Sequence, residues 1–406
     1  RRQRLEAEGL IQSYAARLAS VKEEMERFPE TQRTFFKNGL VLPAGKVLMQ
    51  PDLAKSYRAI AEQGIEWFYQ TEFPRRVEEW MRENGGIVSA RDFQEYRIEV
   101  PEAIRSRYRD YEILGFPPPS SGGAHVAQLL HMLEALDLVS HPAYSADSVH
   151  LIAECMKLAF ADRAFWLGDP GFARVPRGLI ARRYAEALTE KISLEKALAV
   201  ESHGAADEYS TSFFGKHTTH FSTADARGNW VACTATVNTS FGSKVVIPGT
   251  GIVMNNQMDD FSAQPGVPNF FGLVGAEANA VEPGKRPLSS MSPTIVLQGG
   301  QPILSLGAAG GPTIISQTLV NLINILDYEM DPAEALRAPR IHHQWKPDEL
   351  KLERGAAGVA EELERRGHKV VLVEFMGAAQ IVARTTNGLA GFADPRVASP
   401  DGSGGW

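Results

Sequence analysis

Apolar residues recur at three- and four-residue spacing in several stretches of the first half of the chain, and this spacing predicts helices. The stretches cover residues 4–30, 51–63 and parts of 65–83. Two further stretches, near residues 124–136 and 146–165, show the same spacing. We expect these two to be core helices packed on a sheet.

From position 218 the pattern changes to short runs of alternating apolar and polar residues, which predict strands. The runs cover residues 219–223, 230–238, 252–255, 294–297, 303–306, 350–353, 370–374, 381–384 and 388–392, and residues 96–115 alternate similarly. Residues 313–326 predict a buried helix, and a shorter helix is expected near 359–366. The sequence therefore predicts a layered α+β fold with helices around sheets. Residues 199–216 are polar and weakly patterned, as expected of a flexible tail.

Composition narrows the class of protein. A chain of 406 residues holds one large or two medium domains. Its net charge of −7 offers no basic surface for nucleic acid. No apolar stretch is long enough to span a bilayer. The two cysteines, Cys155 and Cys233, cannot build a disulfide framework, and their apolar surroundings favour buried thiols.

Hydroxyl-bearing residues alternate on both sides of a Gly228-Asn229 turn, which predicts a hairpin. The alternation would gather Thr218, Thr234, Thr236 and Asn238 on one side of the paired strands. A threonine is a poor nucleophile unless a base lies beside it. Cleavage of the chain just before Thr218 would supply that base as a new α-amine. A strand threonine in an ordinary cross-strand pair is the alternative.

Gly310 and Gly311 directly precede the predicted helix 313–326. Glycines at a helix N-terminus expose backbone N–H groups and the positive end of the helix dipole, which suit a developing oxyanion. A simple strand-to-helix turn is the alternative. A phosphate-binding loop is excluded because the lysine and hydroxyl residue of that motif are missing.

The segment from His217 to Gly242 resembles the γ-glutamyltransferases, which are N-terminal-nucleophile hydrolases. Further similar blocks follow in family order, at residues 255–262, 286–294, 307–311 and 338–345, with 117–123 and 161–163 upstream. The resemblance implies a four-layer αββα sandwich. It also implies self-cleavage between His217 and Thr218, giving a large-subunit-like portion, 1–217, and a small-subunit-like portion, 218–406, intertwined in one domain.

The resemblance also assigns roles to individual residues. Thr218 would be the nucleophile, and Thr236 would orient it, although β-propensity alone also explains a threonine there. Gly310 and Gly311 would form the oxyanion hole. The remaining predicted residues bind the head group of the donor: Asp260 holds its α-amino group with help from Asn238 and Gln257, and Ser289 and Ser290 hold its α-carboxylate.

Three other features depart from the family or compete with these roles. Residues 265–275 look like the family's mobile lid, but Phe271 stands where many bacterial relatives have tyrosine. His220 shares the strand face of Thr218, and we expect it to be structural or supporting. The pair His342-His343 lacks a third ligand at a sensible spacing, so a structural role is favoured over a metal site. The resemblance implies no metal and no cofactor.

These observations predict an enzyme that takes the γ-glutamyl group from an amide such as glutathione and passes it to water, an amino acid or a peptide. The active form would be a heterodimer of two fragments from one precursor. Related amidases, namely a glutaryl-cephalosporin acylase or a poly-γ-glutamate transpeptidase, are alternatives.

A third alternative is an inert fragment. The family carries an N-terminal segment with an arginine for the donor α-carboxylate, and we find no counterpart of its motif, so we expect the sequence to be N-terminally incomplete. Family resemblance suggests the periplasm or the exterior, but no signal is visible.

Overall fold

The computed structural model describes residues 14–43, 45–206 and 220–397. The chain divides into two compact units. Unit 1 comprises Arg1–Glu99 and Val237–Gln257, and unit 2 comprises Val100–Thr236 and Met258–Trp406. Each unit therefore contains chain from both sides of residue 217. The boundary between the units does not fall at residue 217, and the division into a portion 1–217 and a portion 218–406 stays a prediction.

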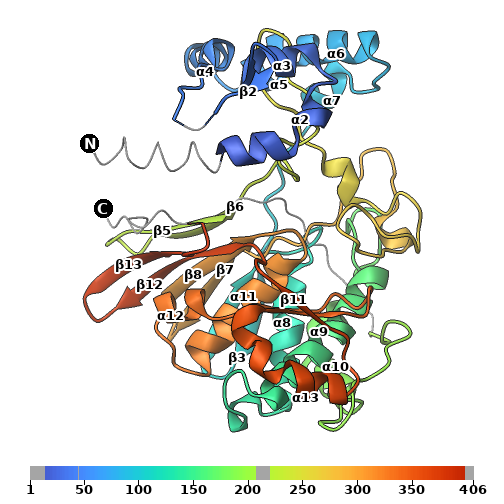
Figure 1. Ribbon diagram of the computed structural model, residues 1–406, viewed down its shortest axis with the longest axis vertical. Coiled ribbons are helices and arrows are strands. Elements are labelled where there is room, and N and C mark those ends of the chain that lie inside the picture. The colour runs from blue at the N-terminus through green and yellow to red at the C-terminus, as the bar shows by residue number, and fades with distance from the viewer. Residues whose placement is uncertain (1–13, 44, 207–219, 398–406) are drawn as a thin grey trace. The chain divides into compact units, whose positions relative to one another are not determined.

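Unit 1 is built mainly of short helices around a small aromatic and aliphatic core (Figure 1). Its elements are a helical stretch at 14–20, α2 (Lys22–Met25), α3 (Pro29–Phe35), β1 (Phe36–Lys37), β2 (Leu40–Val41), α4 (Pro51–Gln63), α5 (Glu66–Tyr69), α6 (Glu72–Glu83) and α7 (Ala90–Gln94). Pro51 lies in the first turn of α4 and Gly64, at φ 77°, ends it. Both residues are suited to these positions, and this helix was predicted with the same bounds.

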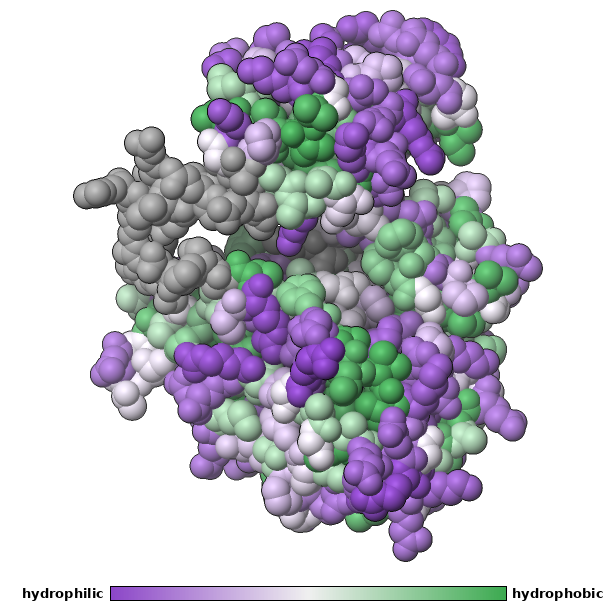
Figure 2. Space-filling view, viewed as in Figure 1, coloured by the Kyte–Doolittle hydropathy of each residue, from purple (hydrophilic) through white to green (hydrophobic). Residues whose placement is uncertain are grey.

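The helices of unit 1 are amphipathic. Phe73 and Val77 of α6 are buried against Trp67 and Ile247, whereas the outward side chains are mostly hydrophilic (Figure 2). One predicted strand of this unit is wrong. Residues 252–255 form only an isolated bridge, between Val253 and Val246. The chain reverses at Gly249 and Gly251, and its two arms share only a few backbone hydrogen bonds, among them Met254 N–H to the Val245 carbonyl at 2.8 Å.

Unit 2 is organised around a six-stranded antiparallel sheet in the order β13-β12-β8-β7-β4-β3. The strands are β3 (Ile104–Tyr108), β4 (Tyr111–Gly115), β7 (Thr294–Gln298), β8 (Gln301–Ala309), β12 (Ala378–Thr385) and β13 (Gly388–Ala393). A smaller sheet contains β9 (Ile341–His342), β10 (Leu350–Glu353) and β11 (Val370–Val373). These strands confirm the alternating runs of the second half of the chain.

Buried helices cover one face of the six-stranded sheet (Figure 1). The helices of unit 2 are α8 (Gly122–Ala135), α9 (Ala146–Trp166), α10 (Arg182–Thr189), α11 (Thr313–Leu326), α12 (Pro332–Arg337) and α13 (Ala360–Arg365). Leu304, Leu306 and Ala308 of β8 belong to the same buried core as α8, α9 and α11. Since side chains alternate along a strand, Ser305 and Gly307 face the other side of the sheet.

A two-stranded hairpin, β5 (His220–Ala224) and β6 (Trp230–Thr234), lies on that other side. Ser305 Oγ lies 2.9 Å from Ser222 Oγ, and a Cβ at Gly307 would lie 2.4 Å from the His220 ring. Glycine at position 307 therefore allows the hairpin to approach the sheet closely. Helices, sheet and hairpin correspond to three consecutive layers of the predicted αββα order, and the α+β class is confirmed.

No helix in the described part of the chain has both the length and the apolar character that a membrane span requires.

Candidate active site

The hairpin that should carry the nucleophile has a well-ordered turn. The Asp225 carboxylate accepts hydrogen bonds from the backbone N–H groups of Arg227 and Asn229, both at 3.0 Å, and Gly228 takes φ 88°. The predicted turn is confirmed, although the loop is longer than two residues, because β5 ends at Ala224 and β6 begins at Trp230.

Of the two predicted catalytic threonines, Thr236 is the one that the structure describes. Thr218 lies outside the described residues. Thr236 was expected on the second strand, but β6 ends at Thr234 and Thr236 follows two residues later, half-buried.

His220 has a structural environment. It is 6% exposed, its Nδ1 lies 3.1 Å from Thr234 Oγ1, and its Nε2 lies 2.9 Å from Ser222 Oγ. Burial lowers the pKa of its imidazole to about 4, so the ring is neutral at neutral pH. Both ring nitrogens are engaged within the hairpin, which fits the predicted supporting role.

Gly310 and Gly311 form a tight turn between β8 and α11. Their φ values are 145° and 60°, which favour glycine. Thr313 Oγ1 donates to the Gly310 carbonyl at 2.8 Å, and Gln317 Nε2 donates to the Ala309 carbonyl at 3.2 Å. The turn is thus held from the first turns of α11, and its backbone N–H groups belong to the N-terminal end of a 14-residue helix.

The predicted lid lies against this turn. A Cβ at Gly311 would lie 2.9 Å from Phe271 Cδ1, so the aromatic ring covers the glycine. Phe271 N–H donates to Asn269 Oδ1 at 3.0 Å, and Gly266 N–H donates to the Gly275 carbonyl at 2.8 Å. The segment is therefore a small, internally bonded loop, and its mobility stays a prediction.

Asp260 lies at the end of the 3-10 helix Gln257–Asp260 and is half-buried. Asn279 Nδ2 donates to its backbone carbonyl at 2.9 Å. Burial raises the pKa of its carboxyl to about 7, which the nearby cation of Arg163 counteracts and the neighbouring Asp259 reinforces. Among the described residues we find no hydrogen bond to this carboxylate, so it is suited to receive a ligand ammonium.

Ser289 and Ser290 lie in a loop whose backbone is hydrogen-bonded to the segment 119–121. Ser121 donates to the Ser289 carbonyl from both its backbone N–H and its hydroxyl, each at 2.8 Å. Ser289 N–H donates to the Pro119 carbonyl at 2.9 Å. A Cβ at Gly122 would come within 1.9 Å of the Met291 carbonyl oxygen. The proline- and glycine-rich block at 117–123 thus serves to hold the serine loop.

Arg163 was not predicted as a site residue, but it joins the parts of the site. It is 4% exposed, and its Nη2 donates to Ser290 Oγ at 3.1 Å. Its Nε donates to Ser121 Oγ at 3.1 Å. Burial lowers the pKa of its guanidinium to about 10, and the charge of Asp260 opposes this shift. The available signal was a charged pair, Asp162-Arg163, inside an otherwise apolar predicted helix.

Contacts within unit 2 connect most of the predicted site. Arg163 donates to Ser290 and interacts electrostatically with Asp260. Asn269 donates to the Asp260 carbonyl at 3.4 Å and leads through Phe271 to Gly311. The resulting site combines hydroxyls, one buried carboxylate, one buried cation and a glycine turn.

Three predicted residues lie outside these contacts. Thr236 lies beyond β6, as described above. Asn238 and Gln257 belong to unit 1, where Asn238 takes φ 77° and its Nδ2 donates to the Asn256 carbonyl at 3.0 Å. Their roles in donor binding stay predictions.

Within the described ranges, one buried group has the composition of a metal site: His150, Glu154 and His368, with ligand atoms within 4.8 Å of one another. These atoms already have partners. His150 Nδ1 lies 2.7 Å from His368 Nε2, and the Lys157 ammonium donates to Glu154 Oε1 at 2.9 Å. A buried cation thus already neutralises the carboxylate, and we assign the group to the structure of unit 2.

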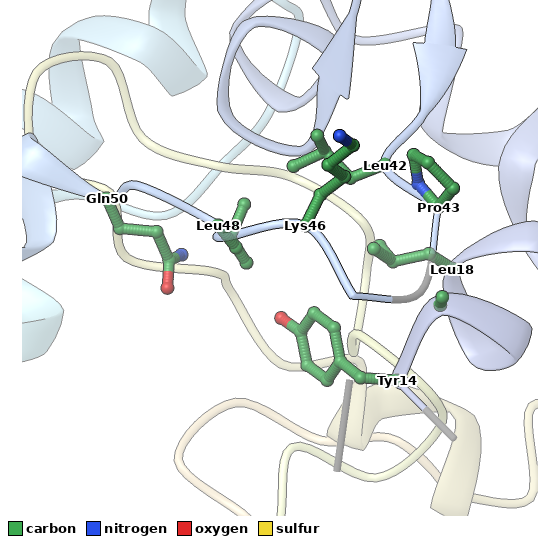
Figure 3. A pocket seen from close by; sticks show the side chains of 8 residues that line it. Tyr14, Leu18, Leu42, Pro43, Lys46, Leu48 and Gln50 are labelled. Carbon is green, nitrogen blue, oxygen red and sulfur yellow. The ribbon is translucent and has the colours of Figure 1, made fainter. Parts of the chain in front are cut away.

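A pocket of about 290 Å³ lies within unit 1 (Figure 3). It is lined by Tyr14, Ala15, Leu18, Leu42, Pro43, Lys46, Leu48 and Gln50. Apolar side chains dominate its surface, and the lining offers no carboxylate, histidine or cysteine. It contains none of the predicted site residues, so we do not place the chemistry there.

Comparison with known proteins identifies related sequences. The Escherichia coli (strain K12) glutathione hydrolase proenzyme is 43% identical over 379 residues, which are 92% of this chain and 65% of that protein. The acylase ACY 1 proenzyme of Pseudomonas sp. (strain SE83) is 38% identical over 86% of this chain and 60% of its own length. The chain spans less than two thirds of either relative.

A solved structure also matches along nearly the whole chain. The cephalosporin acylase from Bacillus halodurans has a TM-score of 0.81 at 29% identity, covering 95% of this chain and 69% of the acylase. The family model described as gamma-glutamyltranspeptidase matches residues 7–401. The chain therefore belongs to the gamma-glutamyltranspeptidase family.

Proposed function

We propose that the whole protein is a γ-glutamyl transferase and hydrolase that uses Thr218 as its nucleophile. The observation that carries this proposal is the presence in one site of two features: the half-buried Asp260 carboxylate, which accepts no hydrogen bond from the described residues, and the Arg163–Ser290 contact. A free amino-acid head group presents an ammonium, which complements the Asp260 carboxylate, and a carboxylate, which complements Ser290 and the cation behind it. The glutathione hydrolase named among the relatives supports a donor of this kind.

The reaction would begin with cleavage of the peptide bond between His217 and Thr218. The Thr218 hydroxyl then attacks the γ-carbonyl carbon of the donor and its proton passes to the new α-amine, whose reference pKa is about 8. The Gly310-Gly311 turn would stabilise the tetrahedral oxyanion through backbone N–H groups. The amine leaving group takes the proton, and an ester on Thr218 remains until water or an acceptor amine displaces the oxygen.

Thr236 would orient the nucleophile. The described hairpin pairs His220 with Thr234, and the same register, carried two residues further, would set Thr218 opposite Thr236. Directly opposed residues in an antiparallel pair have Cβ atoms about 4.5–5.5 Å apart, which suits contact between two hydroxyls. We therefore propose that the ladder extends by these residues in the cleaved enzyme.

The mature protein would be a heterodimer of fragments 1–217 and 218–406. Both compact units contain chain from each fragment, so the fragments would stay associated after cleavage. Asn238 and Gln257 would assist Asp260, as the family resemblance implies. Water, an amino acid or a peptide would accept the γ-glutamyl group.

An acylase is the second candidate, favoured by the cephalosporin acylase fold match and the ACY 1 relative. The two candidates differ in their need for an α-amino anchor. A γ-glutamyl anilide and a glutaryl anilide differ only in that amino group, so their kcat/KM ratio separates the candidates. A ratio well above one supports the proposal, whereas a ratio near or below one favours the acylase.

Mass spectrometry of the purified protein, combined with a glutathione hydrolysis assay, tests the proposal as a whole. We expect two fragments that meet between His217 and Thr218, and release of glutamate from glutathione. An intact chain without turnover would indicate the inert alternative. Cleavage into two fragments without turnover of either anilide would show that Thr218 is a competent nucleophile and that the protein does not bind these donors productively.

A further inference from the structure

A buried cation in contact with the serine loop comes from the core helix α9. Arg163 is 4% exposed and lies three residues before the end of a 21-residue helix that is largely buried. Burying an arginine costs desolvation free energy unless hydrogen bonds and an opposite charge compensate its own charge. Among the described residues the Arg163 guanidinium donates to two hydroxyls, those of Ser121 and Ser290, and the charge of Asp260 acts on it.

We propose that Arg163 is the positioning residue that sets this enzyme's preference for donors with an α-carboxylate, acting through the Ser290 hydroxyl. The inference rests on the proposed function and deepens it. Arg163 Nη2 donates to Ser290 Oγ at 3.1 Å, so this hydroxyl accepts from the protein side. Its own O–H proton is then directed away from the guanidinium, toward a ligand.

A hydroxyl that accepts from a cation is a stronger donor than an ordinary serine. The positive charge polarises the O–H bond, and hydrogen bonds in series strengthen one another. A ligand carboxylate meeting Ser290 would therefore experience part of the charge of Arg163 without displacing it. Ser289 would add the second hydroxyl of the loop, although its Oγ already accepts the Met291 N–H at 3.1 Å.

The same guanidinium fixes the position of the loop. Its Nε donates to Ser121 Oγ at 3.1 Å, and that hydroxyl donates to the Ser289 carbonyl at 2.8 Å. Two of its nitrogens thus hold the serine loop at neighbouring positions, which a lysine ammonium reproduces poorly because it lacks the planar fork. Arg163 therefore has both a charge role and a geometric role.

Arg163 and Asp260 also form a charge pattern. The cation lies on the side of Ser290 and the anion at the end of the 3-10 helix, and each shifts the pKa of the other. A donor head group carries the reverse pattern, with its carboxylate for the cation and its ammonium for the anion. Binding of such a head group would place an opposite charge beside each of these two desolvated groups.

Three anilide donors test this inference in the cleaved enzyme: γ-glutamyl, glutaryl, which lacks the α-amino group, and 4-aminobutanoyl, which lacks the α-carboxylate. The assay runs at about pH 9, where Asp260 is ionised. We expect Arg163→Met to raise KM for the γ-glutamyl donor about tenfold to a hundredfold, with a smaller change in kcat. The KM for the 4-aminobutanoyl donor should stay within about twofold of the parent value.

Two further variants keep the test decisive if Arg163→Met does not fold. Arg163→Lys retains the charge without the fork, and should give an intermediate KM for the γ-glutamyl donor. Ser290→Ala removes the hydroxyl through which Arg163 acts. It should abolish the same discrimination, and adding Arg163→Met to it should change KM little further.

Arg340→Met is the matched control. Arg340 is 1% exposed and Nη2 donates to Asp394 at 2.9 Å, so its loss also removes a buried guanidinium. It should lower Tm without changing the ratio of KM values between donors. Equal losses on all three donors in Arg163→Met would overturn the inference and leave a merely structural arginine. A parent inactive on every donor would instead overturn the proposed function.

Discussion

Replacing Asp260 by asparagine keeps the shape of the side chain and removes the carboxylate that we assign to the donor α-amino group. The structure makes this change informative because the carboxylate is half-buried and has no hydrogen bond among the described residues. Its interactions there are electrostatic, with the cation of Arg163 and the neighbouring Asp259. We therefore expect Asp260→Asn to leave self-cleavage intact and to weaken donor binding.

The size of the effect follows from the contact that is lost. A hydrogen bond between charged groups contributes about 1.5–3 kcal/mol, which corresponds to about a tenfold to hundredfold rise in KM. The effect also depends on pH. The pKa of Asp260 is raised to about 7, so at about pH 5 only about 1% of the parent carboxylate is ionised.

The assay is the pH profile of kcat/KM for a γ-glutamyl anilide, from about pH 5 to about pH 9. The parent should lose about tenfold per pH unit below about pH 6, and Asp260→Asn should lack this limb. The advantage of the parent over the variant should therefore be largest near pH 9 and nearly vanish near pH 5. The control is the same pH profile with a glutaryl anilide, which has no α-amino group for Asp260 to bind. This profile shows the effect of the other titrating groups, including the Thr218 α-amine.

Two neighbouring variants shift the acidic limb in opposite directions. Asp259 raises the pKa of Asp260, so Asp259→Asn should move the limb to lower pH; Arg163 lowers it, so Arg163→Met should move the limb to higher pH. An Asp260→Asn variant that retains the parent's pH profile, or that affects glutaryl and γ-glutamyl donors equally, would refute the assignment of Asp260.

Other expectations follow from the same site. Thr218→Ala should abolish both self-cleavage and turnover, and two fragments from this variant on a gel would show that another residue is the nucleophile. Gly311→Ala places a Cβ 2.9 Å from Phe271 at φ 60°, and should lower kcat by about tenfold or more even when Phe271→Ala relieves the contact; an unchanged kcat would remove the turn from the oxyanion hole. The pKa of Asp260 is raised from 3.8 to about 7 in the folded protein, so the stability of the parent should fall as pH rises through this interval. Asp260→Asn should lack that fall, which Tm measured against pH would show.

Local signals were sufficient for much of the fold. Pro51 and Gly64 bound α4, and the glycine turn before Thr313 marks the start of α11, so both helices were predicted with their observed bounds. The antiparallel strands of unit 2 follow from simple alternation. Residues 252–255 alternate equally well but pair with the preceding arm of the chain only through a short bridge. The length of a pairing is a tertiary property that a single run of residues does not contain.

In the site, too, residues that belong to a local motif could be predicted, whereas a residue defined by distant contacts could not. Asp260, Ser289, Ser290 and the glycine turn were named from motif and resemblance. Arg163 was recognised only as part of a similar block, because its importance comes from contacts to Ser121 and Ser290, which are 42 and 127 positions away. The end of β6 before Thr236 was likewise missed, since alternation continues where the ladder stops.

The central claim is that Thr218 carries the γ-glutamyl group as an ester, and a trapping experiment tests it most directly. The cleaved enzyme is mixed with a γ-glutamyl anilide, quenched in acid within one turnover, digested and analysed by tandem mass spectrometry. We predict one added γ-glutamyl group on the peptide that begins with Thr218, located on that first residue. An added group on Thr219, on Ser289 or Ser290, or on no residue while the anilide is still consumed, would contradict the account.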